Sequence, residues 1–338
     1  MLPFIYHPIY SQLELPEGHR YPIMKYQYLY ESVLVHMEKD DWKEHVQFFQ
    51  PEALTVEEVK RVHDQEYVDL LVNGNMQAAK MRRIGFPWSE SLITRTLTSA
   101  AGTALTANKA LEYGVAIHLS GGYHHAHKEF GSGFCLFNDL VIAARQALEV
   151  EHVDKVLIID SDVHHGDGTA TLCHDEPDII TLSFHCDKNF PARKPQSDLD
   201  VPLVRGTGDE DFLMAFKEVV DMALNLHRPD LVIYDAGVDI HQDDELGYFD
   251  DPGYKMGYLM CQAMRAARLV VDIGLHLQYD SVYTNYNDYE PLKWTPDIAS
   301  KYMEDYALLN ESYAESEVKR YISWAGQAIS YKLGERVW

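Results

Sequence analysis

A polar segment that follows an apolar run carries the residues best suited to bind a divalent metal ion. The segment DSDVHHGDG occupies residues 160–168, directly after VLII. In an extended chain, alternate side chains share a side, so Asp160, Asp162 and His164 would face the same way. Zinc takes imidazole nitrogen and carboxylate oxygen as ligands, and a catalytic site commonly has three of them. Asp239, after a second apolar run, would supply the third, which predicts a site for one metal ion.

A second histidine-rich segment, HLSGGYHHAH at residues 118–127, could move protons beside that ion. Imidazole titrates near neutral pH, so His124 and His125 together could act as an acid and a base. Carboxylates would orient the two rings, and we expect Asp160 and Asp167 to do so. The other two histidines of the segment are assigned ordinary structural or surface roles, namely His118 and His127.

The elements that must position these residues are β-strands that alternate with helices. Short β-branched apolar runs, each ending in Gly, His or Asp, predict strands within the segments 115–122, 155–168, 178–185 and 229–241. Helical patterns precede two of these runs, at 98–114 and 211–226. This alternation predicts an α/β fold with a parallel sheet flanked by helices. Ligands bind beyond the carboxyl ends of such strands, where the polar segments would converge.

The pattern changes after about residue 248. Residues 251–278 are predicted to form a turn and one long helix, and the tyrosine-rich segment 279–291 a loop. Two further helices are predicted at 294–309 and 316–335, the first with a threonine N-cap followed by proline.

Composition limits the classes of partner. The 338 residues include 53 acidic and 29 basic ones, a net charge of -24 with histidine neutral. Such a chain would be repelled by nucleic acid, and a cationic partner fits it better. No run approaches the roughly 18 apolar residues of a membrane span. Four scattered cysteines form no CxxC pair, which indicates a reducing compartment, so we expect a cytoplasmic protein. The oligomeric state stays open.

The order of the motifs resembles the histone deacetylase family, nearest its small bacterial and class IV branch. The resemblance covers residues 1–249 and rests on nine motifs, which follow one another along the chain as HP, ELPEGHRYPIMKY, HDQEYVDLL, GGYHHAH, GSGFCLFND, DSDVHHGDG, SFH, NFPARKPQSDLD and YDAGVDIHQDDELG.

The resemblance implies the arginase/deacetylase fold and hydrolysis of an N-acyl amide, usually acetyl-lysine or a related amine, at one zinc or ferrous ion. Asp162, His164 and Asp239 match the family's metal ligands. His124 and His125 match its tandem histidines, with Asp160 behind the first and Asp167 behind the second. Gly133 and Phe134 match the positions that line the acyl-lysine tunnel. Asp160 and Ser183 match the family's structural potassium site.

The sequence departs from the family pattern after Asp239. Members of the family continue to a glycine-rich loop whose tyrosine stabilises the oxyanion, and no GGGY or GGY follows Asp239 here. Loss of one oxyanion donor typically lowers turnover about 10²- to 10³-fold. Four tyrosines of the tail could substitute, although surface or packing roles are favoured for them: Tyr279, Tyr283, Tyr286 and Tyr289.

The tail, residues 250–338, resembles the end of a bacterial zincin-like family of putative peptidases, a domain of unknown function with the number eight-eight-five. The HExxH metal-binding helix of that family is absent from the chain, so the tail is not a peptidase by itself. The sequence pattern thus indicates a chimera joined near Gly247 to Asp251. The deacetylase-like sheet would lack its last strands, which leaves an exposed edge.

Three functions are compatible with these motifs. The first is a metal-dependent deacylase with zinc-activated water and a tandem-histidine acid/base pair. The second is a catalytically impaired protein that binds metal and serves as a binding module or has no selected activity. A ureohydrolase is less favoured, because its two metals need further aspartates that GGYHH does not supply.

Overall fold

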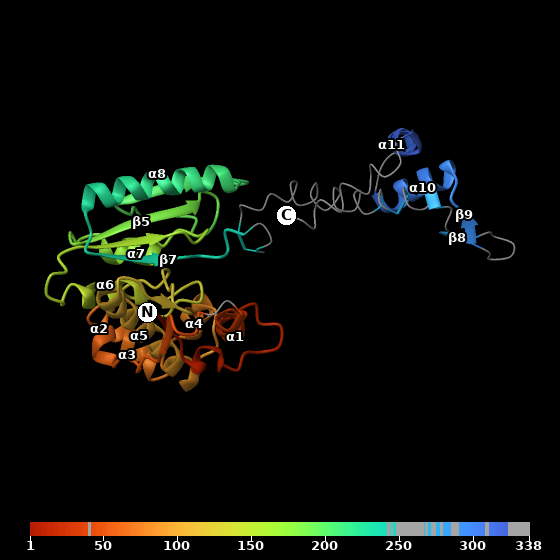
Figure 1. The fold of residues 1–338 in the computed structure, drawn as a ribbon. Helices are drawn as coiled ribbons and strands as arrows, with labels where there is room; N and C mark the ends of the chain where they lie inside the picture. Colours follow the sequence, from red (N-terminus) through yellow and green to blue (C-terminus); the bar gives the residue numbers. More distant parts are fainter. Residues whose placement is uncertain are drawn as a thin grey trace. The chain divides into compact units, whose positions relative to one another are not determined.

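Apolar runs of the sequence form parallel β-strands in the computed structural model of the chain (Figure 1). The structure describes residues 1–39, 42–241, 244, 246–247, 267, 270–271, 275–277, 280–284, 291–307 and 311–323. The chain divides into two compact units, Met1–Phe249 and Asp250–Trp338, each with a hydrophobic core of its own.

The N-terminal half of the first unit is mainly helical around a small sheet. Strands β1 (Leu2–Ile5), β2 (Val46–Phe49) and β3 (Ile117–His118) pair in parallel in the order β2-β1-β3. The helices of this half are η1 (Pro8–Ser11), α1 (Lys25–Lys39), α2 (Val56–Lys60), α3 (Gln65–Val72), α4 (Ala78–Ile84), α5 (Glu90–Tyr113) and α6 (Asp139–Ala147).

Local sequence explains why α5 is the longest of these helices. The Ser89 side chain accepts the amide of Leu92 at 3.1 Å, which caps the first turn. Gly114, at φ 87°, takes the left-handed conformation that ends the helix. Between these caps the buried positions are mostly Ala, Ser and Thr. These small side chains let neighbouring elements approach the helix closely.

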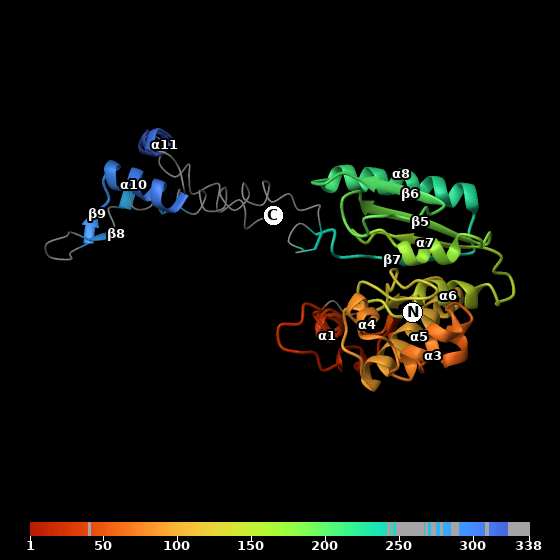
Figure 2. The same ribbon diagram turned by 180° about the vertical axis from the view of Figure 1, so that it is seen from behind.

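The second half of the unit carries the larger sheet. Its strands β4 (Val156–Asp160), β5 (Ile179–Cys186), β6 (Leu199–Leu203) and β7 (Leu231–Asp235) pair in parallel in the order β6-β5-β4-β7. The helices of this half are α7 (Asp167–Cys173) and α8 (Asp209–His227). Helix α8 covers one face of the sheet, and α7 lies on the other (Figures 1 and 2).

Strand β4 is buried on both faces because its side chains belong alternately to two cores. Leu157 and Ile159 pack with the apolar face of α8, including Phe216. Val156 and Ile158 join the larger core with α5 and α6. This double burial explains the unbroken VLII run, since a strand of a parallel sheet covered on both faces has no polar side.

The strands predicted within residues 155–168, 178–185 and 229–241 are present in one sheet, as β4, β5 and β7, but residues 115–122 are not part of it. Only Ile117 and His118 form a strand there, and they pair with β1. Strand β7 pairs with β4 alone among the described strands, and its side chains Val232 and Tyr234, on the face toward α8, are 40% and 52% exposed. Within the described residues no further strand follows β7 in the sheet, as the loss of later strands predicts.

The described part of the second unit contains a two-stranded antiparallel sheet, two continuous helices, and further helical residues at 267, 270–271 and 275–277. The sheet and the two continuous helices are β8 (Asp280–Thr284), β9 (Pro291–Lys293), α10 (Pro296–Ala307) and α11 (Glu311–Ser323). The prediction of a loop over 279–291 is wrong at residues 280–284, which form β8. Their sequence, DSVYT, contains β-branched and aromatic residues, which favour strands. Most of the predicted helix 251–278 and the junction from residue 248 onward lie outside the described residues.

A search of the described helices for length and apolar character finds none that could cross a bilayer.

Replacing Gly102 by alanine should destabilise the protein, although helix propensity alone would favour alanine by about 1 kcal/mol. A Cβ atom on Gly102 would overlap the His118 ring and the Tyr10 hydroxyl, which hydrogen-bond each other at 2.9 Å under α5. Overpacking of this kind costs about 1–3 kcal/mol. Urea unfolding measures the change, with Thr94→Ala on the exposed face of α5 as the control. A Gly102→Ala variant that is more stable than the wild type would contradict the close approach of His118 and Tyr10 to α5.

Candidate metal centre and paired histidines

The polar residues meet at the carboxyl edge of the larger sheet because its strands are parallel and in register. Asp160, the last residue of β4, is the register partner of Ser183 on β5 and of Asp235 on β7. The chain beyond Asp160 remains at this edge, where the amide of Asp162 donates to Asp160 Oδ1 at 3.0 Å. The sheet thus gathers three side chains and begins the loop that carries the next ones.

Asp162, His164 and Asp239 converge as one donor set. His164 Nδ1 lies 2.9 Å from Asp162 Oδ1 and 2.9 Å from Asp239 Oδ2. Asp239 is fixed in turn by the amide of Val163, which donates to its Oδ1 at 2.9 Å. The three ligand atoms lie within 4.8 Å of one another. Two carboxylates and one imidazole are a donor set that suits Zn²⁺ or Fe²⁺.

The charges within this set also fit a cation. Burial raises the pKa of Asp239 to about 6, and the negative charge of Asp162 adds to the rise. Burial opposes ionisation of His164 too, but hydrogen bonds to Asp162 and Asp239 raise its pKa to about 9. The carboxylates of Asp162 and Asp239, which contact each other, therefore both pair with the protonated ring of His164. A divalent ion in the place of that proton would relieve their repulsion.

The tandem histidines have carboxylate partners of their own. His124 Nδ1 lies 2.7 Å from Asp160 Oδ2, and His125 Nδ1 lies 2.7 Å from Asp167 Oδ1. All four side chains are buried. Burial opposes the charge of His124, but Asp160 raises its pKa well above the ordinary value. Burial, together with the charge of His124, lowers the pKa of His125 to about 4. At neutral pH the pair therefore holds one protonated and one neutral ring.

The loop that carries these histidines is fastened to α6. The carboxylate of Asp139, in the first turn of α6, accepts the amides of Gly122 at 3.1 Å and Tyr123 at 2.7 Å. Gly122 has φ 79°, and a Cβ there would lie 2.5 Å from Asp235 Oδ1. The loop therefore needs glycine both for its conformation and for its contact with the end of β7.

Of the two tunnel residues suggested by the family resemblance, Gly133 lies beside His125, whereas the Phe134 ring packs against other aromatic rings. Gly133 and Phe134 both have positive φ, 53° and 66°. A Cβ on Gly133 would come within 2.6 Å of His125 Cδ2, so glycine permits the approach of this turn to the ring. The Phe134 ring packs at 5.3 Å from Phe86.

A small cavity adjoins the proposed potassium position. It has a volume of about 10 Å³, and its lining includes Asp160, Ser183 and Ser197. That volume is the space of about one water-sized sphere. The lining also includes apolar side chains, among them Ile158 and Leu182, so the cavity has room for one small ion or water and none for an organic ligand.

Several residues near the site carried no clear signal in the sequence. Asp235 lies with His124 and Asp160 in a second group of close donor atoms, although YDAG indicated only the end of a strand. His127 Nε2 lies 3.0 Å from Asp167 Oδ2, so this histidine shares the carboxylate behind His125. His118 has the structural role expected of it, because it bonds Tyr10 and Thr103.

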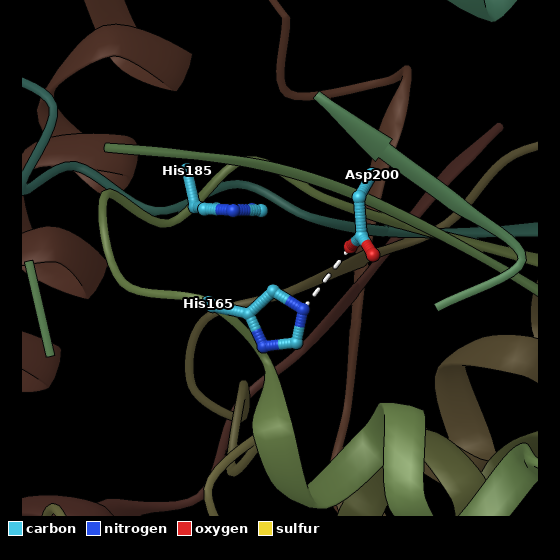
Figure 3. A group of neighbouring side chains, drawn as sticks. All are labelled: His165, His185 and Asp200. Carbon is cyan, nitrogen blue, oxygen red and sulfur yellow. Dashed lines mark hydrogen bonds and ion pairs between the residues drawn. The ribbon is translucent and has the colours of Figure 1, made fainter. Parts of the chain in front are cut away.

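A third group of close donors contains His165, His185 and Asp200 (Figure 3). His165 Nε2 lies 3.1 Å from Asp200 Oδ1, and the two rings meet edge to face with centroids 4.6 Å apart. His165 Nδ1 is buried without a hydrogen-bond partner. Asp200 thus holds one nitrogen of the His165 ring, and this His–Asp contact orients the ring in the loop after His164.

Of the four tail tyrosines considered for oxyanion binding, only Tyr283 lies among the described residues. Its hydroxyl donates to Asp305 Oδ2 at 2.5 Å within the second unit. Tyr279, Tyr286 and Tyr289 lie outside the described part of the chain.

Comparison with known proteins identifies both parts of the chain. Residues 22–272 match the family model described as "Histone deacetylase domain". Residues 243–338 match "Bacterial protein of unknown function (DUF885)", which supports the interpretation of a chimera.

Relatives extend the first of these matches. An uncharacterized protein of Picosynechococcus is 42% identical over 245 residues, which are 72% of this chain and 80% of that protein. The acetoin utilization protein AcuC of Staphylococcus aureus strain MRSA252 is 32% identical over 226 residues, 60% of this chain. This chain thus spans only 58% of the length of AcuC.

A solved structure shares the fold. The crystal structure of an HDAC homolog complexed with SAHA aligns with a TM-score of 0.60 at 20% identity. The alignment covers 74% of this chain and 72% of that one. Together with the family match over residues 22–272, these likenesses show that the chain belongs to the histone deacetylase family of hydrolases.

Proposed function

We propose that the protein is a metal-dependent deacylase that removes an acetyl or other acyl group from an N-acylated lysine or a related amine. The observation that carries the proposal is the convergence of Asp162, His164 and Asp239 beside two histidines in opposite protonation states. Zinc is the metal that this donor set favours, with ferrous ion as the alternative.

In the proposed reaction Asp162, His164 and Asp239 would hold the ion. When bound, such an ion supplies a Lewis acid that polarises the acyl carbonyl. His125 accepts a proton from the attacking water at Nε2, because Asp167 occupies Nδ1. Asp160 keeps His124 protonated until it delivers a proton to the nitrogen as the C–N bond breaks. The acid product then gives its proton to the amine, so that a carboxylate and a protonated amine leave, and the proton on His125 returns to His124 through solvent before the next turnover.

The surroundings of the site support an amine carrier. The chain carries a net charge of -24, which favours the approach of a cationic substrate. Gly133 and Phe134 are the proposed walls of the acyl-lysine channel, because their turn reaches the His125 ring. Asp160 and Ser183 are the proposed ligands of a structural potassium ion at the small cavity.

A second candidate is a metal-binding protein without effective turnover. The hydroxyl proton of Tyr123 is engaged elsewhere, because it donates to Ser99 Oγ at 2.7 Å. Tyr123 is therefore not free to stabilise an oxyanion. Stoichiometric zinc without hydrolysis of any acyl-lysine amide would favour this candidate. Replacing residues 250–338 with the C-terminal segment of an active relative should then raise turnover by orders of magnitude.

Replacing His125 by alanine should reduce turnover about 10²- to 10⁴-fold, because the proton acceptor is lost. Hydrolysis of a fluorogenic acetyl-lysine amide by the zinc-loaded protein measures the effect. Zinc content should stay near one ion per chain, since His125 is not among the proposed ligands. His45→Ala, at an exposed position, serves as the control. Equal rates for the zinc-loaded wild type and His125→Ala would remove His125 from the mechanism.

Replacing Asp239 by asparagine should stabilise the zinc-free protein at pH 7, because it removes a buried charge beside Asp162. Because the pKa of Asp239 is about 6, the gain in the free energy of unfolding is at most about 3 kcal/mol. The gain should shrink as pH falls below 6, where the wild-type carboxyl becomes neutral. Thermal unfolding in chelator measures this effect, and added zinc should stabilise the wild type far more than the variant.

Asp221→Asn on the exposed side of α8 is the matched control for the lost charge. A zinc-free Asp239→Asn protein that melts below the wild type would count against the assignment. Equal stabilisation of both proteins by zinc would do so too.

A further inference from the structure

The loop between β5 and β6 is tied together by one lysine. The ammonium of Lys194 donates to the backbone carbonyls of Asp187 at 3.0 Å, Asn189 at 2.8 Å and Pro191 at 2.9 Å. An ammonium group has three N–H donors, so these carbonyls use all of them. Lys194 makes these contacts from the far end of the same loop, and thereby closes residues 187–194 around its charge.

Three carbonyl oxygens that point at one spot need a positive charge there, because their dipoles repel one another. The cation also satisfies backbone acceptors that the irregular loop does not pair within a sheet. Lys188 in the same loop is different, since its side chain is 73% exposed and pairs with the Asp187 carboxylate at 2.7 Å. Surface pairs of that kind contribute little. Lys194 is therefore the cation on which the shape of the loop depends.

The closed loop presents two side chains to the proposed metal centre. Asn189 is 3% exposed, and its amide nitrogen lies 3.4 Å from His164 Nε2 and donates to the Leu246 carbonyl at 2.7 Å. Phe190 meets the His125 ring edge to face, with centroids 5.0 Å apart. One loop thus contacts both the proposed metal-binding histidine and the proposed base.

The contact with His164 is at the edge of the ring opposite the proposed metal. Nδ1 faces Asp162 and Asp239, whereas Nε2 faces Asn189. Groups at the second nitrogen of a metal-bound imidazole fix the orientation of the ring, and losing them typically weakens metal binding about 10- to 100-fold. The backbone of Asn189 is held at its carbonyl by Lys194.

We propose that Lys194 is a positioning residue that holds Asn189 and Phe190 against His164 and His125. This inference rests on the proposed function, because it takes His164 as a metal ligand. Lys194 itself touches neither histidine and acts only through the loop. Its removal should therefore change the metal centre without removing any ligand.

The experiment compares Lys194→Met, Lys194→Arg and Lys188→Met in the full chain. Amide hydrogen exchange of peptides spanning residues 186–197 reports the order of the loop, and competition with a chelator gives the zinc affinity. Lys194→Met should speed exchange in the loop at least tenfold and weaken zinc binding about tenfold. Lys194→Arg keeps the cation and should restore part of both properties, whereas Lys188→Met should match the wild type.

A spectroscopic readout separates positioning from simple loss of stability. The visible absorption of the cobalt-substituted protein should shift in Lys194→Met, because the His164 ring changes orientation, and Lys194→Arg should shift less. Asn189→Ala should weaken zinc binding while leaving the exchange of the loop near that of the wild type. Lys194→Met is interpreted only where its far-ultraviolet circular dichroism matches the wild type; otherwise Lys194→Arg and Asn189→Ala decide.

Loop exchange and zinc affinity within twofold of the wild type in folded Lys194→Met would overturn the proposal. So would faster exchange with unchanged zinc affinity and cobalt spectrum, because Lys194 would then stabilise the loop alone. These measurements need no turnover. Absence of deacylase activity would therefore refute the proposed function and leave the test of Lys194 intact.

Discussion

The hydrogen bond between Asp160 and His124 joins the two halves of the first unit where the chemistry is expected. Asp160 ends β4 of the larger sheet, whereas His124 belongs to a loop that follows β3 of the smaller one. The two sheets share no strand pairing among the described residues, so they are joined by the larger core, which includes residues of α5, α6 and β4, and by contacts at the carboxyl edge. Both partners are buried, and an unpaired member would carry a large desolvation cost. Together with the bonds from Asp139, this contact fixes the loop that carries His124.

The same edge explains why the site has so many opposed charges. Folding alone gains nothing from placing Asp162 and Asp239 together, and their proximity costs stability until a cation separates them. In the proposed reaction the neighbouring pairs, His124 with Asp160 and His125 with Asp167, would divide the tandem histidines into a proton donor and a proton acceptor. Their opposite pKa shifts arise from ordinary causes, namely burial, a carboxylate partner and the charge of the adjacent ring. An acid and a base at neutral pH thus require no unusual residue.

Strand periodicity and motif order were enough to predict the larger sheet and to group Asp162, His164 and Asp239. Alternation along a strand is a local property, and parallel strands align their carboxyl ends, so these residues could be grouped from the sequence alone. The contribution of Asn189 could not be foreseen, because it depends on the path of an irregular loop. Residues 115–122 joined a different sheet because strand pairing depends on distant partners, as it does for β1 and β3. The strand β8 was not predicted, because the polar and tyrosine-rich composition of the segment 279–291 indicated a loop in spite of its β-branched residues.

The order of the ligands along the chain has a consequence for biosynthesis. Every proposed metal ligand, both tandem histidines and their carboxylate partners lie before residue 240. Domains fold as units while the chain is synthesised from its N-terminus. The metal centre can therefore assemble before the second unit has emerged from the ribosome. Zinc supplied at that stage would act as a folding ligand for the first unit.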